Sequence, residues 1–247
     1  MLALLSCLRR LIALVDLCVF TLFISAAALL PRPVARRLYR VCFAPWCRSF
    51  IRALDVSLEL HQHYVGPLPK QYVLIANHPS AFEDIGIPAL FPVRSLAKAE
   101  LAHWWVVGRI AVAAGTLFVK RDSSESRKAA TGALIDAVRQ GDNLALYPEG
   151  GCKGRRIAGR FFNGAFIASF ETGVPILPVF LYYPAQAAFE WDNQHLLTKL
   201  WEIAISPNRR AEYHVFDPIH PAHFESPEAM KDHAYRLYQA WQRRFLD

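Results

Sequence analysis

The sequence predicts an α/β domain with a mostly parallel sheet flanked by helices, preceded by N-terminal membrane-associating helices. Three observations lead to this prediction. Short apolar strands alternate with helical segments from about residue 67 onward, which is typical of a parallel sheet covered on both faces. An apolar run of twenty residues, 11–30, lies near the N-terminus. Positive charge gathers in residues 1–52, with eight arginines against one acid, whereas the rest of the chain is neutral.

Residues 1–66 are predicted to anchor the chain to a membrane. Residues 11–30 are long enough to cross a hydrocarbon core, and residues 34–54 form an amphipathic segment that Pro45 should bend. Arginines beside apolar helices are attracted to anionic headgroups by about 1 kcal/mol each, which indicates the cytoplasmic face of the inner membrane. Because arginines flank the apolar run on both sides, a full span and a shallow hairpin stay equally open. A cleaved signal peptide and an ordinary surface helix are the alternatives.

Composition narrows the class of protein. The chain of 247 residues is 53% hydrophobic and carries a formal net charge of +7. This charge sits beside the apolar segment and not on a nucleic-acid-binding module, so nucleic acid is not expected as a partner. The five cysteines are odd in number and lack metal-site spacing, and no histidine cluster completes a zinc site. We therefore expect free thiols, no bound metal and no cofactor.

Residues 67–247 are predicted to form the second domain. Asp122 and Glu125 are a candidate capping pair for one of its helices, and Ser226 with Pro227 should open the last helix. The predicted strands are 72–76, 116–119, 143–147, 176–183 and 213–216, and the predicted helices are 100–113, 122–140, 165–171 and 226–247. Because the carboxyl ends of parallel strands meet at one edge of a sheet, functional groups are expected there.

His78 is the first candidate for chemistry, because it follows the buried strand 72–76 at its carboxyl end. A histidine there can take a proton from an alcohol if a carboxylate holds its other ring nitrogen. Glu83 and Asp84 follow closely, and either could be that carboxylate. A lone histidine near a strand end more often has a structural role, so the prediction depends on further motifs.

Three further segments stand at or near other predicted strand ends. They are Gly115–Arg121, Tyr147–Gly151 and Val174–Val179. With Asn77–Ser80 they resemble the PlsC-like family of glycerolipid acyltransferases, whose members show NHxSxxD, GxxFxxR, FPEGT and VPIxPV in this order. The resemblance covers about residues 71–183, and three of the four motifs are close.

The resemblance implies a membrane-associated O-acyltransferase. In this family the motif histidine deprotonates a lysolipid or glycerol hydroxyl, which attacks the thioester of acyl-CoA or acyl carrier protein without a covalent enzyme intermediate. The implied partners are therefore an acyl donor, a lysolipid acceptor and an anionic membrane surface. The first implied acceptor is 1-acyl-sn-glycerol-3-phosphate, which would give phosphatidic acid. A lyso-ornithine lipid, another lysophospholipid, or a non-catalytic lipid-binding protein on the same fold are the alternatives.

The resemblance also implies residues that bind the acceptor, especially its phosphate. A guanidinium suits this role because it can hold a phosphate at two points. The substrate-binding candidates are Asn77, Ser80, Gly115, Phe118, Lys120, Arg121, Glu149, Gly150, Gly151 and Lys153. For Lys120 and Arg121 a solvated strand end is the alternative, and Glu149 could instead orient its loop.

The chain departs from the family pattern at two places. Glu83 holds the position of the family acid, whereas Asp84 has its identity one residue later, so the choice between them stays open. Gly151 replaces a threonine, and Cys152-Lys153 stand where many phosphatidate-forming members have Arg-Ser. These changes weaken lysophosphatidic acid as the acceptor. A nucleophilic role for Cys152 is not favoured, because no activating group is evident in the sequence.

Overall fold

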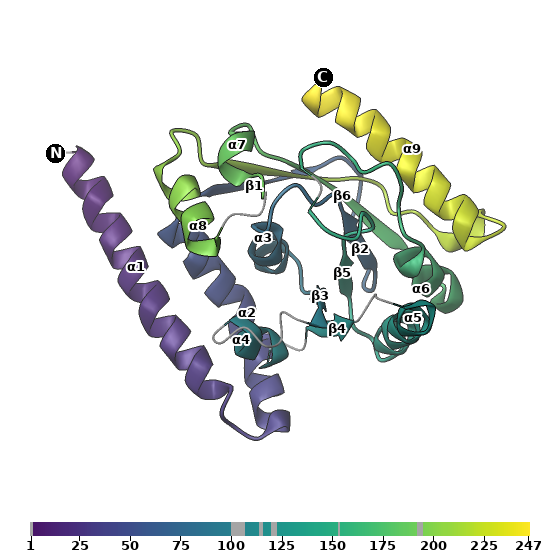
Figure 1. Ribbon diagram of the computed structural model, residues 1–247, viewed down its shortest axis with the longest axis horizontal. Helices are drawn as coiled ribbons and strands as arrows, with labels where there is room; N and C mark the ends of the chain where they lie inside the picture. The colour runs from purple at the N-terminus through teal and green to yellow at the C-terminus, as the bar shows by residue number, and fades with distance from the viewer. Residues whose placement is uncertain (1, 100–106, 114–115, 120–122, 153, 192–194) are drawn as a thin grey trace.

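A seven-stranded sheet forms the centre of the protein (Figure 1). The computed structural model describes residues 2–99, 107–113, 116–119, 123–152, 154–191 and 195–247. The strands lie in the order β1-β7-β6-β2-β5-β3-β4, and among these neighbours β6–β7 is the antiparallel pair. Their bounds are β1 Ser57–Gln62, β2 Val73–Ala76, β3 Arg94–Lys98, β4 Leu117–Val119, β5 Leu144–Leu146, β6 Ile176–Tyr182 and β7 Arg210–Val215. The predicted α/β class with a mostly parallel sheet is confirmed.

Helices cover both faces of this sheet. The central strand β2 shows why, since Leu74 and Ala76 belong to one buried cluster and Val73 and Ile75 to the other. The first cluster includes residues of α1, α2 and α3, and the second includes residues of α5, α6 and α9. The helices are α1 Leu2–Ala27, α2 Arg32–Ala53, α3 Glu83–Leu90, α4 Val107–Ala113, α5 Ser124–Arg139, α6 Gly164–Thr172, α7 Gln186–Phe189, α8 Leu196–Ile205 and α9 Pro227–Leu246.

The sequence analysis did not predict two strands of the sheet, β1 and β3. Strand β1 is mostly polar and half exposed at the sheet edge, and β3 begins and ends in cations, so neither has the apolar run of a buried strand.

The N-terminal cap of α5 also differs from the prediction. Ser123 and Ser126 exchange the two reciprocal hydrogen bonds of a capping box, in place of Asp122 and Glu125. Asp122 lies outside the described residues.

Helices α1 and α2 form a hairpin beside the sheet (Figure 1). The Trp46 indole N–H donates to Thr21 Oγ1 at 2.9 Å. The Asp16 carboxylate accepts hydrogen bonds from the Ser49 hydroxyl and from Arg52 of α2. These contacts explain how an acid is tolerated in the apolar run of α1. Helix α2 continues through Pro45.

The outer face of α1 is strongly apolar and exposed. Leu11, Ile12, Val19 and Leu22 are each 57–71% exposed. Within the part of the chain that the structure describes, Leu8–Ala27 is the one helical segment long and apolar enough to cross a membrane by length and composition. Apolar surface of this extent indicates contact with lipid.

Candidate active site

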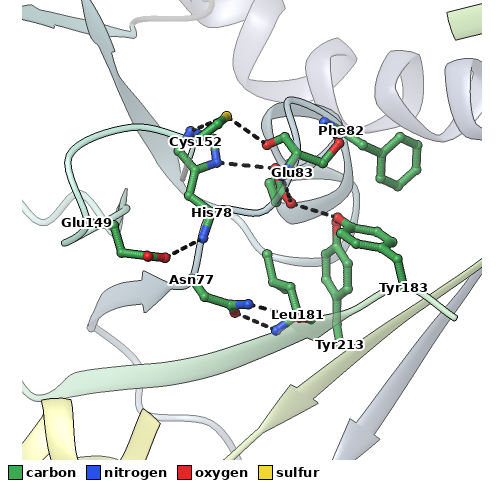
Figure 2. Close-up of polar contacts among 10 residues, drawn as sticks. Asn77, His78, Phe82, Glu83, Glu149, Cys152, Leu181, Tyr183 and Tyr213 are labelled. Atoms are coloured by element: carbon green, nitrogen blue, oxygen red, sulfur yellow. Dashed lines mark hydrogen bonds and ion pairs between the residues drawn. The ribbon is translucent and has the colours of Figure 1, made fainter. Parts of the chain in front are cut away.

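The loop after β2 is held rigidly at the carboxyl edge of the sheet (Figure 2). The Asn77 amide donates to the Leu181 carbonyl at 2.9 Å, and its oxygen accepts from the Leu181 N–H at 2.7 Å. Asn77 thus continues the pairing of β2 with β6 by one residue through its side chain. This buried amide fixes the start of the loop, which places His78 just beyond the strand.

The imidazole of His78 is paired with a buried carboxylate. His78 Nδ1 lies 3.3 Å from Glu83 Oε2, and Glu83 is fully buried at the start of α3. Glu83 Oε1 accepts from the Ser80 N–H at 2.9 Å and from the Tyr183 hydroxyl at 3.0 Å. Ser80 and Tyr183 therefore fix the carboxylate, and the carboxylate fixes the ring of His78.

Burial raises the pKa of Glu83 well above its usual range, against the opposing hydrogen bonds from its own backbone, Tyr183 and Ser80. A carboxylate in this position gains strongly from a neighbouring cation. Protonation of His78 supplies one, so the pair favours a histidine that accepts a proton at Nε2.

Asp84 takes a different position from Glu83. Its side chain is solvent-accessible in the first turn of α3, whereas the Glu83 side chain is fully buried. Asp84 still lies close to the site, because desolvation by the surrounding protein raises the pKa of its carboxyl and the nearby charge of His78 lowers it. The geometry therefore favours Glu83 as the residue that orients His78. This agrees with the sequence register, which puts Glu83 at the position of the family acid.

Glu149 binds backbone groups on two segments. Its Oε1 accepts from the His78 N–H at 2.8 Å and its Oε2 accepts from the Ala158 N–H at 2.6 Å. The residue is 3% exposed. Of the two interpretations of Glu149, this geometry favours the orientation of the loop over contact with the acceptor.

Gly150 and Gly151, which end the segment Tyr147–Gly151, have different steric requirements. Gly150 has φ +81°, and a Cβ there would meet the Phe162 ring at 2.6 Å, so only glycine fits. At Gly151 a Cβ would point into open space.

Ser80 is fully buried, and its hydroxyl accepts from the Phe82 N–H at 3.0 Å. Asn77 and Ser80 thus both support the loop from inside.

Cys152 lies next to Nε2 of His78, the ring nitrogen that does not face Glu83. Its Sγ is 3.5 Å from His78 Nε2 and 3.4 Å from the Ser80 carbonyl oxygen. Burial and the neighbouring carboxylates of Glu83 and Asp84 raise the pKa of the thiol, so it is protonated at neutral pH. The neutral thiol therefore lines the space next to His78 Nε2.

Aromatic side chains complete the site, and the sequence analysis did not single them out. The Tyr147 ring stacks on His78 with centroids 3.9 Å apart. The Tyr183 hydroxyl, which binds Glu83, also lies 3.3 Å from the Tyr213 hydroxyl. Tyr147 could have been found, since it occupies the aromatic position of the FPEGT motif. Tyr183 and Tyr213 gave no signal, because their roles arise from packing around Glu83.

The predicted site residues are only partly brought together. His78, Glu83, Ser80 and Glu149 share one hydrogen-bonded network. Asn77, next to His78 in the chain, pairs separately with Leu181 (Figure 2). Phe118 lies on β4 at the far edge of the sheet, where β5 and β3 separate it from β2. The remaining candidates Gly115, Lys120, Arg121 and Lys153 lie outside the described residues.

The site has the parts of a general-base enzyme that activates a hydroxyl group. A carboxylate fixes one ring nitrogen, and the other nitrogen faces a half-buried position lined by a neutral thiol. Such a site at the carboxyl edge of a parallel sheet suits group transfer to an alcohol.

Comparisons with known proteins identify the family. The profile of the Acyltransferase family matches residues 57–182, about half of the chain. A lyso-ornithine lipid O-acyltransferase of Pseudomonas aeruginosa is 32% identical over 195 residues, covering 76% of this chain and 71% of that protein. A 1-acyl-sn-glycerol-3-phosphate acyltransferase of Neisseria meningitidis is 27% identical over 139 residues, covering 55% of this chain and 53% of that protein. The chain therefore belongs to the acyltransferase family and is an acyltransferase.

A solved structure shows the same fold. The 1-acyl-sn-glycerophosphate acyltransferase PlsC of Thermotoga maritima superposes with a TM-score of 0.59 at 20% sequence identity. The match covers 98% of this chain and 95% of that one. Together with the family profile and the relative from Pseudomonas aeruginosa, this fold confirms the resemblance to the PlsC-like family that the motifs indicated.

Proposed function

We propose that the chain transfers a fatty acyl group from acyl-CoA or acyl carrier protein to the free hydroxyl of a lysolipid, with His78 as general base. The observation that carries this proposal is the His78–Glu83 pair, in which Nδ1 is held at 3.3 Å and Nε2 faces the half-buried side lined by Cys152.

The reaction follows from this arrangement. The acceptor hydroxyl gives its proton to His78 Nε2 while its oxygen forms a bond to the thioester carbonyl carbon. The tetrahedral intermediate then collapses, the carbon–sulfur bond breaks, and the donor thiolate leaves and takes the proton from Nε2. Glu83 stabilises the imidazolium between these steps. The product ester and the free thiol balance the reaction without a covalent enzyme intermediate.

A lyso-ornithine lipid is the first candidate for the acceptor. The relative from Pseudomonas aeruginosa, which carries that activity in its name, is 32% identical to this chain. The replacement of the motif arginine by Cys152 also fits a headgroup other than a phosphate monoester. The second candidate is 1-acyl-sn-glycerol-3-phosphate, which the relative from Neisseria meningitidis uses according to its name. The other predicted contacts to the acceptor stay part of the proposal, namely those from Gly115, Phe118, Lys120, Arg121, Gly150, Gly151 and Lys153.

Residues 1–66 hold the enzyme on the cytoplasmic face of the inner membrane in this proposal, and residues 67–247 catalyse the transfer. Support comes from Asp55, at the exit of α2, which pairs with Arg9 at 2.6 Å and with Arg10 at 2.7 Å near the start of α1. Both ends of the hairpin thus lie on one side, next to the sheet. A hairpin inserted from that side fits this arrangement better than a single span.

The proposal is tested by turnover of the purified full chain in lipid nanodiscs. Acyl-CoA and acyl carrier protein are each supplied with lyso-ornithine lipid or with 1-acyl-sn-glycerol-3-phosphate, and the acylated lipid and the released thiol are measured. His78→Ala should abolish turnover and keep membrane association, whereas His223→Ala, at an exposed histidine, should match the wild type. Turnover retained in His78→Ala would contradict the assignment of the base.

The same assay separates general-base chemistry from covalent catalysis. Cys152→Ala should retain substantial turnover, because no acyl group passes through the thiol. Complete loss of turnover in a folded Cys152→Ala protein, together with a trapped acyl-cysteine in the wild type, would favour a thioester intermediate instead.

A further inference from the structure

A second cluster of reactive side chains lies on the strand pair β1–β7. The parallel register places His61 beside His214 and Glu59 beside Glu212. Because alternate residues of a strand share a face, these four side chains lie on one face of the sheet. His61 Nε2, His214 Nε2 and a carboxylate oxygen of Glu212 all lie within 4.8 Å of one another.

Two nitrogen atoms of this cluster are buried without a partner. His61 Nε2 and His214 Nε2 have no hydrogen-bond partner among the residues that the structure describes. His214 is 5% exposed. A buried polar atom left unpaired destabilises the fold, so these nitrogens indicate a ligand that the chain itself does not supply. Glu212 Oε2 is 3.7 Å from His214 Nε2 and 3.9 Å from His61 Nε2.

His214 and Glu212 are oriented by hydrogen bonds from other side chains, as metal ligands in proteins usually are. His214 Nδ1 lies 3.0 Å from His63 Nε2. If Nδ1–H donates in this bond, His214 Nε2 keeps a free lone pair that faces the cluster. The other oxygen of Glu212 accepts from Arg210 at 2.7 Å, which fixes the carboxylate. Both His214 and Glu212 therefore have outer partners that set their orientation.

We propose that His61, His214 and Glu212 bind one divalent transition-metal ion, for which Zn²⁺ is the best fit. Two imidazoles and a carboxylate are a zinc ligand set, whereas Mg²⁺ and Ca²⁺ require mainly oxygen donors. Zinc–ligand bonds of about 2.0–2.1 Å put neighbouring donors of a tetrahedral site about 3.3 Å apart. The separations of 3.7 and 3.9 Å are slightly larger, so a small contraction forms the site.

Binding requires one side chain to move. The rings of His61 and His214 are stacked at 4.7 Å with an angle of 15°, and an ion cannot lie in both ring planes in that arrangement. The His61 side chain is 39% exposed and can tilt toward the ion, while His214 is buried and stays in place. Glu59 Oε2, at 3.7 Å from His61 Nε2, or a water completes the coordination.

The proposed ion would join the edge of the sheet to its interior. Strand β1 directly follows the α1–α2 hairpin and pairs with β7 alone among the described strands. A metal bound by His61 of β1 and His214 of β7 therefore ties the exit of the anchor to the catalytic sheet. Strands β7 and β6 separate β1 from β2, which carries the His78 loop, so we assign the ion a structural role.

The test is zinc binding by the purified full chain, produced without a histidine tag and stripped with a chelator. Titration against a chromogenic competitor should show one Zn²⁺ per chain. His61→Gln, at the more exposed ligand, should weaken binding at least about tenfold, since even outer-partner losses cost this much. Glu212→Gln serves as the second variant if His61→Gln does not fold. His223→Gln, at an exposed histidine outside the cluster, should bind as the wild type does.

A second readout places the ion. Zn²⁺ should slow amide hydrogen exchange in residues 57–62 of the wild type and leave it unchanged in His61→Gln. The proposal is overturned if the wild type binds no Zn²⁺ at micromolar concentrations. It is equally overturned if folded His61→Gln and Glu212→Gln bind as tightly as the wild type, since the ion would then lie elsewhere, for example at His78 and Cys152. Neither zinc binding nor hydrogen exchange measures acyl transfer. A failure of the zinc proposal would therefore leave the proposed function untouched.

Discussion

At the scale of single residues, the position of one buried carboxylate decides the chemistry of the site. Glu83 receives hydrogen bonds from Ser80 and Tyr183 and faces His78 Nδ1. An anion in such surroundings is costly unless a cation forms beside it. In the proposed reaction, proton transfer to His78 creates that cation, so burial of Glu83 would stabilise the protonated form of His78.

The two neighbouring acids should therefore differ strongly in effect. Glu83→Gln removes the charge that stabilises the imidazolium, and kcat should fall by about 10²–10⁴, the range of general-base contributions. Asp84→Asn alters an exposed carboxylate and should change kcat by less than about fivefold. Steady-state rates of both variants, with far-UV circular dichroism as the folding control, check this. Equal and small losses would mean that neither acid orients His78.

At the scale of elements, Asp55 joins the hairpin to the sheet. Its carboxylate pairs with Arg9 and Arg10 of α1 and with Arg209, next to β7, at 2.6–2.9 Å. Partial burial acts to raise the pKa of Asp55, but the hydrogen bond and charge of Arg10 and the charges of Arg209 and Arg9 outweigh it and hold the pKa below its usual range. One side chain thus fixes the hairpin at the edge of the sheet.

Asp55→Asn should lower the free energy of unfolding by about 1–3 kcal/mol, the range for hydrogen bonds to charged groups. Asparagine tolerates the left-handed backbone at this position, φ +55°, so the substitution isolates the charge. Because the folded pKa is lowered, the stabilisation is complete above about pH 4–5 and is lost as the pH falls through the folded value. Denaturant unfolding in detergent at pH 7 and pH 3 measures both effects.

The difference between wild type and Asp55→Asn should accordingly shrink at pH 3. Asp232→Asn is the matched control, since that side chain is 60% exposed and pairs with its neighbour Lys231. A difference that stays constant between the two pH values would show that the charge of Asp55 does not carry the effect.

At the scale of the whole molecule, a second apolar face accompanies the anchor. Helix α8 exposes Leu197, Trp201 and Ile205, one turn apart, at 68%, 66% and 58%. In Figure 1 α8 lies on the same side of the molecule as α1. Two exposed apolar faces on one side favour a surface that rests on a bilayer.

Replacing Leu197 and Trp201 of α8 by glutamine should weaken binding of the full chain to vesicles containing anionic lipid. The expected loss is about thirtyfold or more, because burial of these two side chains contributes on the order of 2–4 kcal/mol. Val65→Gln, at a fully exposed valine after β1, is the control and should bind as the wild type does. Vesicle co-sedimentation measures the binding. Unchanged sedimentation of the double variant would remove α8 from the membrane contact.

The sequence by itself determined the fold class and the apolar N-terminal helix, and it pointed to His78 as the proposed centre of the chemistry. Each of these depends on signals that neighbours in the chain supply. Strand β2 has a continuous apolar run, residues 11–30 have the length of a span, and Asn77-His78 belongs to an ordered set of motifs. Strand β1 was missed for the same reason, because its polar residues carry no local signal until β7 pairs with them.

Only the tertiary structure decided which groups meet. The pairing of Glu83 in preference to Asp84 with His78 depends on how the first turn of α3 packs against Tyr183. The cluster of His61 with His214 depends on the register of β1 with β7, which joins residues far apart in the chain. Side-chain direction is set by packing and strand register, and neither is encoded in the spacing of residues along the sequence.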